Sequence, residues 1–167
     1  MKSSSWIHPI CHRLSVPNSG DRRLPDSPGA YVLLLELSRP DTVEVGALGP
    51  IEFPAATYAY VGSAMAGLSR RVRRYVRPVT RPRWHIDYLL PYAQSISLLT
   101  AESSERIECE IASALAGSLP SVPRFGSSDC PCASHLHIAS NANAALTAAS
   151  TAIRHAGAEP KRFRLSD

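Results

Sequence analysis

Residues 29–37 read GAYVLLLEL and residues 57–63 read TYAYVGS, and these two stretches decide the fold. The first is a nearly continuous apolar run that ends at the turn residues 38–41, so it predicts a buried β-strand. The second alternates and is rich in aromatic and β-branched residues, which predicts a further strand that ends at Gly62.

A cationic helix follows the second strand directly. Residues 67–76 read GLSRRVRRYV, in which Leu68, Val72 and Tyr75 recur at helical spacing while arginines fill the other face. This pattern predicts an amphipathic helix, and we expect Pro78 to stop it because proline cannot continue a helical hydrogen-bond ladder.

The rest of the chain predicts an α+β protein with a small, mainly antiparallel central sheet flanked by helices. The expected elements are a strand at 42–45 paired with the first strand as a hairpin, a short helix at 84–90, a strand at 95–100, a helix at 105–116, an edge strand at the end of 125–139, and a helix in the Ala-rich stretch 141–156. We expect residues 1–27 to be a flexible N-terminal extension, 28–140 the folded domain, and 141–167 an Ala-rich and then basic C-terminal extension.

The composition suits one globular domain and a polyanionic partner. Of the 167 residues, 44% are hydrophobic and 19% are charged, and no apolar run approaches the roughly 18 residues of a membrane span. No signal peptide is evident, so we expect a cytoplasmic protein without a membrane partner. The formal net charge is +4, and 16 of the 18 basic residues are arginine, seven of them between Arg70 and Arg83. This concentration indicates a nucleic acid.

The order of the motifs carries a family resemblance. GAY (29–31), YVG (60–62) and GLSRRVRRY (67–75) are followed by WHIDYLL (84–90), an EC pair at 108–109 and FGSSDC (125–130). This order resembles the GIY-YIG nucleases, most of all their Uri-type branch of UvrC and intron-endonuclease type. The resemblance implies a GIY-YIG nuclease-like fold and a metal-dependent endonuclease that hydrolyses DNA phosphodiester bonds, directed by structure or damage as in DNA repair.

The resemblance also implies the catalytic residues, which are Tyr31, Tyr60, Arg71 and Glu108. Glu108 would ligate one Mg²⁺ or Mn²⁺, and since it is the single well-placed carboxylate, a two-metal site is disfavoured. On a helical wheel Glu108 lies at the border of the apolar face and points partly inward. Either tyrosine can be the general base, because a free tyrosine has a pKa of about 10 that the metal or Arg71 must lower. Arg70 is the alternative to Arg71.

A second group of side chains would contact the nucleic-acid backbone. These residues are Arg70, Arg73, Arg74, Tyr75, Arg77, Arg81, Arg83 and His85. His85 and Asp87 diverge if residues 84–90 are helical and share a face if they are extended. They either contact the nucleic acid or buttress the site, or they have a capping or core-polar role. Trp84 either stacks on an unpaired base or is buried. Two alternatives to a DNA endonuclease remain: a non-catalytic nucleic-acid-binding module on the same fold, and a ribonuclease. The sequence leaves the oligomeric state undetermined.

The cysteines and the histidines near them form a second candidate site. Cys130, Cys132 and His135, with His137 nearby, can supply ligands to a tetrahedral zinc, although the one-residue gap between the cysteines is tighter than usual. The alternative is a reduced, hydrogen-bonded loop. Cys109 is either a fourth ligand or a buried thiol.

Overall fold

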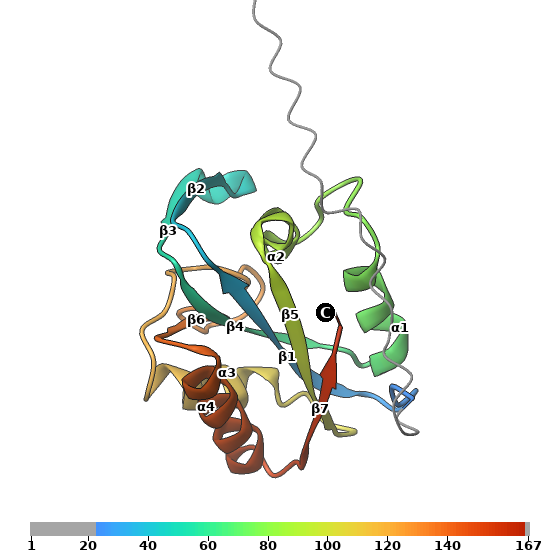
Figure 1. Cartoon of the computed structure of the whole chain (residues 1–167). Helices are drawn as coiled ribbons and strands as arrows, with labels where there is room; N and C mark the ends of the chain where they lie inside the picture. The colour runs from blue at the N-terminus through green and yellow to red at the C-terminus, as the bar shows by residue number, and fades with distance from the viewer. Residues whose placement is uncertain (1–22, 166–167) are drawn as a thin grey trace, which may run out of the picture.

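A computed structural model describes residues 23–165 and shows a five-stranded sheet between two pairs of helices (Figure 1). The sheet contains β1 (Gly29–Leu37), β4 (Ala56–Ser63), β5 (Ser95–Glu102), β6 (Leu136–Ala139) and β7 (Pro160–Arg164) in the order β6-β4-β1-β5-β7. All four pairings are antiparallel, which confirms the predicted fold class.

The helices divide between the two faces of the sheet. One face carries α1 (Leu68–Val72), which continues as the 3-10 turn η2 (Arg73–Val76), and α2 (His85–Leu89), which continues as η3 (Leu90–Tyr92). The other face carries α3 (Glu108–Ala116) and α4 (Ala142–His155) (Figure 1). A separate hairpin of β2 (Asp41–Glu44) and β3 (Pro50–Phe53), joined through η1 (Gly46–Leu48), follows β1.

Strand β1 is buried on both faces because helices cover the sheet on either side. Tyr31 and Leu33 point into the apolar core under α1 and α2, whereas Ala30 and Val32 point into the core under α3 and α4. Successive side chains of a strand alternate between faces, so a strand covered on both sides needs a continuous apolar run. This explains the sequence of residues 29–37.

The GAY and YVG motifs lie opposite each other in the sheet. Tyr31 pairs with Gly62 across the β1–β4 ladder, and its ring lies over the glycine backbone. A Cβ atom at Gly62 would lie 2.2 Å from both Cζ and Oη of Tyr31, so the packing of this tyrosine requires glycine.

The structure corrects three predictions about single elements. Residues 41–44 pair with β3 rather than with β1, because β4 and β5 occupy both edges of β1. The helix expected from residue 68 is α-helical only to Val72 and then tightens to η2, before Pro78. The helix expected from residue 105 begins at Glu108.

The folded unit extends beyond residues 28–140 at both ends. Buried alanines of α4 belong to the core on the α3 side, and β7 pairs with β5, so the segment expected to be a C-terminal extension is part of the fold. At the other end, the carbonyls of Pro25 and Ser27 accept hydrogen bonds from the backbone N–H groups of Ser69 and Leu68, and Ser69 Oγ donates to Asp26. Residues 1–22 of the expected N-terminal extension lie outside the described residues.

Within residues 23–165, no helix combines the length and the apolar character that crossing a bilayer requires.

Replacing Gly62 with alanine should destabilise the fold by about 1–3 kcal/mol, the usual cost of overpacking a core. The added methyl group would collide with the ring of Tyr31, which is itself buried. The free energy of unfolding in urea measures the effect. Gly117→Ala is the matched control, because its Cβ would meet nothing nearer than the Ala114 carbonyl oxygen at 3.4 Å. Equal stability of the two variants would contradict this account of the motif.

Candidate active site and metal centre

Three tyrosines from three elements meet on the face of the sheet that α1 covers. Tyr31 of β1 and Tyr75 of η2 share a hydrogen bond between their hydroxyl groups, and their ring centroids are 5.7 Å apart. Tyr60 of β4 lies close enough for its charge to raise the pKa of Tyr31, and the charge of Tyr75 likewise raises the pKa of Tyr60. All three rings are buried. The structure thus brings the two motif tyrosines together and adds Tyr75 to them.

The environment of these tyrosines keeps them protonated. Burial is the largest cause that raises the pKa of Tyr31, Tyr60 and Tyr75, and the charge of Arg71 opposes it at all three. A phenol with a raised pKa donates a hydrogen bond at neutral pH and does not accept a proton. Either tyrosine therefore needs a further positive charge before it can act as a base.

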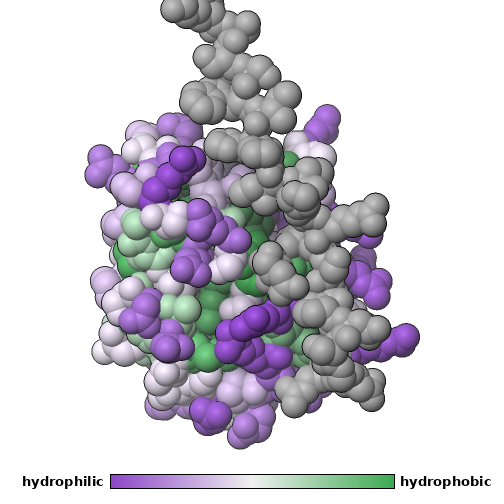
Figure 2. All heavy atoms as spheres, viewed as in Figure 1, coloured by the Kyte–Doolittle hydropathy of each residue, from purple (hydrophilic) through white to green (hydrophobic). Residues whose placement is uncertain are grey.

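A cleft of about 350 Å³ lies beside this tyrosine cluster. It is lined by Ala64, Ala66 and Gly67 before α1, by Arg70 and Arg71 of α1, by Arg74 of η2, and by Arg83 and Trp84 before α2. Hydrophilic side chains are spread over the visible face of the molecule, and some stand at its right-hand edge (Figure 2). We call this cavity the arginine cleft. Arg71 and Arg74 belong to it and also face the tyrosines, since Arg74 Cζ lies 5.8 Å from the Tyr75 ring.

A buried aspartate organises one wall of the arginine cleft. Asp87 Oδ2 accepts hydrogen bonds from Arg74 Nη2 at 2.5 Å and from the backbone N–H groups of Arg83 and Trp84 at 2.7 and 3.1 Å. Its other oxygen, Oδ1, is buried and has no hydrogen-bond partner among the described residues. Asp87 thus holds Arg74 and the start of α2 in place.

The sequence left a capping or core-polar role open for Asp87, and the structure places Asp87 in that role. An acidic residue three positions after the residue that precedes a helix commonly caps that helix. His85 diverges from Asp87, as expected for a helical segment, and its Nδ1 accepts a hydrogen bond of 2.9 Å from the Gly126 N–H. His85 therefore ties α2 to the loop before β6 and does not line the arginine cleft.

Glu108 lies at the start of α3, and the apolar side of that helix packs on the opposite face of the sheet from the tyrosines. Its side chain is 13% exposed, which agrees with the expected inward direction. Oε1 lies 3.7 Å from Arg106 Nη1, and Oε2 is buried without a hydrogen-bond partner among the described residues. The carboxylate acts electrostatically on Cys132 and His135. Among the described residues, Glu108 thus interacts with Arg106, two positions before it, and with Cys132 and His135, and with none of the three tyrosines.

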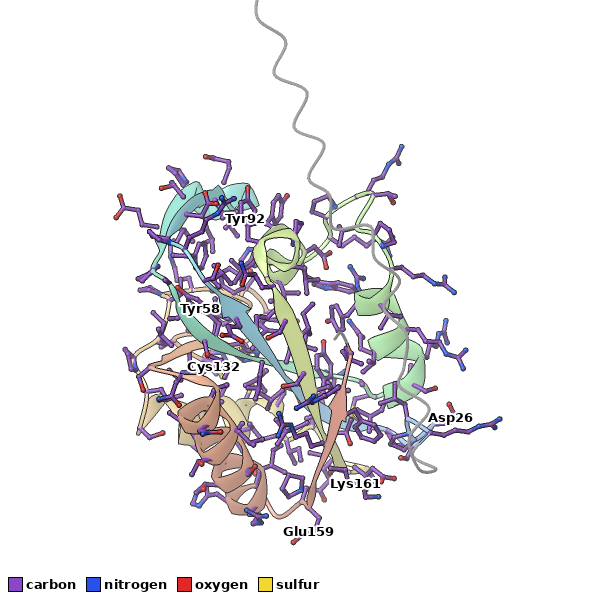
Figure 3. The ribbon with its side chains drawn as sticks, viewed as in Figure 1. Asp26, Tyr58, Tyr92, Cys132, Glu159 and Lys161 are labelled. Carbon is purple, nitrogen blue, oxygen red and sulfur yellow. The ribbon has the colours of Figure 1, made fainter. Side chains whose placement is uncertain are left out.

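Four potential metal ligands converge beside Glu108. The ligand atoms of Cys109, Cys130, Cys132 and His135 all lie within 4.8 Å of one another. His135 Nε2 is 3.4 Å from Cys130 Sγ and 4.0 Å from Cys109 Sγ. A tetrahedral zinc site, with bonds of about 2.0 to 2.3 Å, places its ligand atoms roughly 3.5–3.8 Å apart. We call this set the Cys3His group; Cys132 marks its place near β6 in Figure 3.

The Cys3His group can hold a metal ion, and its ligands suit zinc-like ions rather than Mg²⁺. All three cysteines are free thiols. Burial, followed by the neighbouring thiols of Cys132 and Cys130, raises the pKa of Cys109 to about 12. Thiols crowded in this way need a cation to ionise together. Cys109, which the sequence left as either a ligand or a buried thiol, lies with the other three.

Two groups of predicted residues lie elsewhere. Arg73, Arg77 and Arg81 are exposed and do not line the arginine cleft. His137 is fully buried, and both its ring nitrogens lack hydrogen-bond partners among the described residues. It is not one of the four convergent ligands. Burial, and then the charge of His135, lowers the pKa of His137 to about 4.

Fold and site together define an α+β protein that has an arginine-lined cleft on one face of an antiparallel sheet and a Cys3His group beside its edge strand β6. A sequence model of the family described as "Domain of unknown function DUF123" matches residues 30–158. The match covers most of the chain, from β1 to just beyond α4, and the protein belongs to this family. Comparisons with curated proteins and with solved structures found no match.

Replacing Asp87 with asparagine should destabilise the protein by about 1–3 kcal/mol, because Arg74 loses a charged hydrogen-bond partner and the buried side chain cannot be rehydrated. Urea unfolding measures the change. The matched control is Asp41→Asn, since within the described part of the chain the Asp41 side chain accepts a hydrogen bond only from the backbone N–H of its neighbour Thr42. A loss below about 0.5 kcal/mol, typical of surface substitutions, would show that Asp87 does not hold this wall of the cleft.

Proposed function

We propose that the protein is a metal-dependent nuclease that hydrolyses phosphodiester bonds in DNA. The observation that carries the proposal is the convergence of Tyr31, Tyr60 and Tyr75 with the guanidinium of Arg71, which also lines the arginine cleft. The tyrosines come from β1, β4 and η2. The motif order that resembles the GIY-YIG nucleases supports the same assignment.

Each side chain has a chemical task in this proposal. Arg71 presents a planar fork of donors that fits two non-bridging oxygens of a phosphate and stabilises the negative charge that develops on them. The tyrosine hydroxyls, which burial keeps protonated, donate hydrogen bonds that orient the attacking water or the phosphate. The tyrosine that acts as the base is the one whose pKa the nearby positive charge lowers enough for its hydroxyl group to lose its proton.

Glu108 is the residue that would hold the catalytic cation. Its buried Oε2 has no hydrogen-bond partner among the described residues, and a buried carboxylate oxygen needs a cation or a donor to compensate it. A carboxylate is a hard oxygen ligand that suits Mg²⁺ or Mn²⁺. Because Glu108 lies beside the cysteines on the α3 side of the sheet, a bound ion would supply positive charge to the reacting phosphate only if the substrate reaches both sites.

DNA recognition through the arginine cleft would depend mainly on phosphates. Arginine contacts to the backbone give affinity and orientation without base identity, which fits a nuclease directed by the structure or damage of its substrate, as in DNA repair. Each neutralised phosphate releases counterions, so binding should weaken steeply as salt increases.

A second candidate is a non-catalytic nucleic-acid-binding module on the same fold. Two observations favour it. Glu108 interacts with Arg106, Cys132 and His135 rather than with the tyrosines. Burial raises the pKa of Tyr31 and Tyr60, which keeps both hydroxyl groups protonated. Such a module would use the arginine cleft for binding and would never cleave.

A cleavage assay with matched variants separates the two candidates. We expect the protein to cut some of a panel of labelled nicked, flapped, abasic and plain DNAs in Mg²⁺ or Mn²⁺, and Arg71→Ala to lower the rate by at least about tenfold, since one lost donor to a developing oxyanion costs 10²–10³ in other enzymes. Glu108→Gln should abolish cleavage and retain binding. Arg154→Ala is the control, because Arg154 is exposed on α4, on the other face of the sheet from the cleft, and its loss should leave the rate nearly unchanged.

The outcome that would reject the nuclease is retained DNA binding with no cleavage of any DNA in either metal. Cleavage confined to a matched set of RNA substrates would instead identify a ribonuclease on the same site.

We also propose that the metal held by the Cys3His group is zinc. Three thiolates and one imidazole form one of the common structural zinc sites. The group joins the start of α3 to the irregular segment that precedes β6, where Arg124 N–H donates to the Ala133 carbonyl and His135 N–H donates to the Phe125 carbonyl. A structural zinc there would hold this segment against the edge of the sheet.

Protein purified without added metal should contain about one zinc per chain by elemental analysis, and the double variant Cys130→Ser/Cys132→Ser should contain none, because two of the four expected ligands are lost. The variant should also be cut more readily by protease between residues 117 and 135. Cys11→Ser is the matched control, since among residues 23–165 the convergent ligands are Cys109, Cys130, Cys132 and His135. Equal zinc contents in the double variant and the control would refute the site.

A further inference from the structure

Trp84 lies in the arginine cleft with much of its surface open to solvent. It is 38% exposed, although most tryptophans in a folded domain bury more of their surface. The Cζ atoms of Arg74 and Arg71 lie 3.6 Å and 4.7 Å from the centroid of its ring. Arg74 therefore already stacks on the indole, so a base would stack on the part of the ring that remains exposed, beside guanidinium groups that can bind a phosphate.

We infer that the arginine cleft binds an unpaired nucleotide, whose base stacks on Trp84 while the neighbouring phosphate is held by arginines. This inference rests on the proposed function in taking a nucleic acid as the partner. It adds that the protein engages a single-stranded segment at this cleft, such as a flap, a gap or a frayed end. Base stacking on an aromatic side chain tolerates any sequence, since every base has a π-face.

The charges of the cleft fit a phosphate. Among residues 23–165 no ion pair involves Arg70, Arg71 or Arg83, whereas Arg74 is paired with Asp87. Three guanidinium groups are thus available to an anion, and their forked donors match the oxygens of a phosphate. The charge of Arg74 is already neutralised by Asp87, so Arg74 holds the wall of the cleft in place and does not bind the phosphate.

The Trp84 ring is held in place before any ligand arrives. Asp87 Oδ2 accepts from both the Arg74 guanidinium and the backbone N–H of Trp84, so one buried carboxylate fixes both partners of the stack. Binding to a preorganised platform avoids the entropy cost of ordering its side chains. Asp87 is therefore a positioning residue for this subsite.

The shape and chemistry of the cleft favour an unpaired nucleotide over two other anionic ligands. Its volume of about 350 Å³ lies in the range of small-ligand pockets, which suits one nucleotide rather than a duplex. In a duplex the faces of internal bases are covered by their neighbours and cannot reach Trp84. A phosphoserine peptide would use the arginines but has no aromatic ring to cover the exposed part of the indole.

Binding of labelled oligonucleotides in EDTA, where cleavage is suppressed, tests the inference. We expect Trp84→Ala to weaken binding of single-stranded dT10 by roughly tenfold and of a covalently closed circular duplex, which has no ends, by less than about twofold, because only the single strand offers a free base. Trp84→Phe should retain most of the affinity for dT10. Asp87→Asn should weaken dT10 binding because the stack is no longer held.

The matched control is Tyr92→Ala, which removes the other large exposed aromatic side chain in the described part of the chain. Tyr92 lies on η3 and does not line the cleft, so its loss should leave dT10 binding unchanged. The chain contains two tryptophans, so in a Trp6→Phe background the fluorescence of Trp84 is observed alone and dT10 should quench it. Circular dichroism verifies that each variant is folded.

The inference is overturned if folded Trp84→Ala binds dT10 as tightly as the parent, if it loses affinity for single strand and duplex equally, or if a phosphoserine peptide quenches Trp84 as strongly as dT10 does. These outcomes differ from failure of the proposed function. Should the protein never cleave, yet bind dT10 through Trp84, the nuclease proposal falls and the subsite stands. Should it cleave in Mg²⁺ while Trp84→Ala changes no affinity, only the subsite falls.

Discussion

The burial of strand β1 on both faces is the constraint on which the rest of the structure depends. Two helices cover each face, and β4 and β5 occupy its two edges, so every neighbour of this strand is protein. Such a position leaves little freedom for the side chains that cross it. Tyr31 is therefore held with its ring over Gly62, and its hydroxyl meets that of Tyr75. A reactive group fixed in this way is preorganised by the core itself.

The two faces of the sheet carry different chemistry. The α1 face holds the tyrosines, the arginine cleft and the buried Asp87, which joins Arg74 to the backbone of Trp84. The α3 side holds Glu108 next to the Cys3His group, near the edge strand β6. Gly126 lies between them, since a Cβ on it would come within 2.8 Å of the Tyr60 ring and 3.2 Å of the Cβ of His135. The loop that carries two of the cysteines thus touches both sites.

Local sequence patterns were enough to predict most of the fold. The apolar run of β1, the alternation in β4, the Ala-rich α4 and the edge strand β6 follow from rules that act within a few residues, namely side-chain periodicity and the avoidance of exposed apolar surface. The pairing of β2 with β3 and the place of β7 could not be predicted in this way. Both depend on which strand edges remain free once β1, β4 and β5 have assembled, and that is a property of the whole sheet.

The sequence by itself determined which chemical groups the protein has and their order: two motif tyrosines, an arginine-rich helix, a glutamate at the start of a helix, and cysteines near a histidine. Only the tertiary structure decided which of them meet. It joined Cys109 to a loop more than twenty residues away, associated Glu108 with that loop, and gave Asp87 its partners. The physical reason is that spacing along a chain limits only near neighbours, whereas the packing of helices on a twisted sheet sets the distances between groups far apart in sequence.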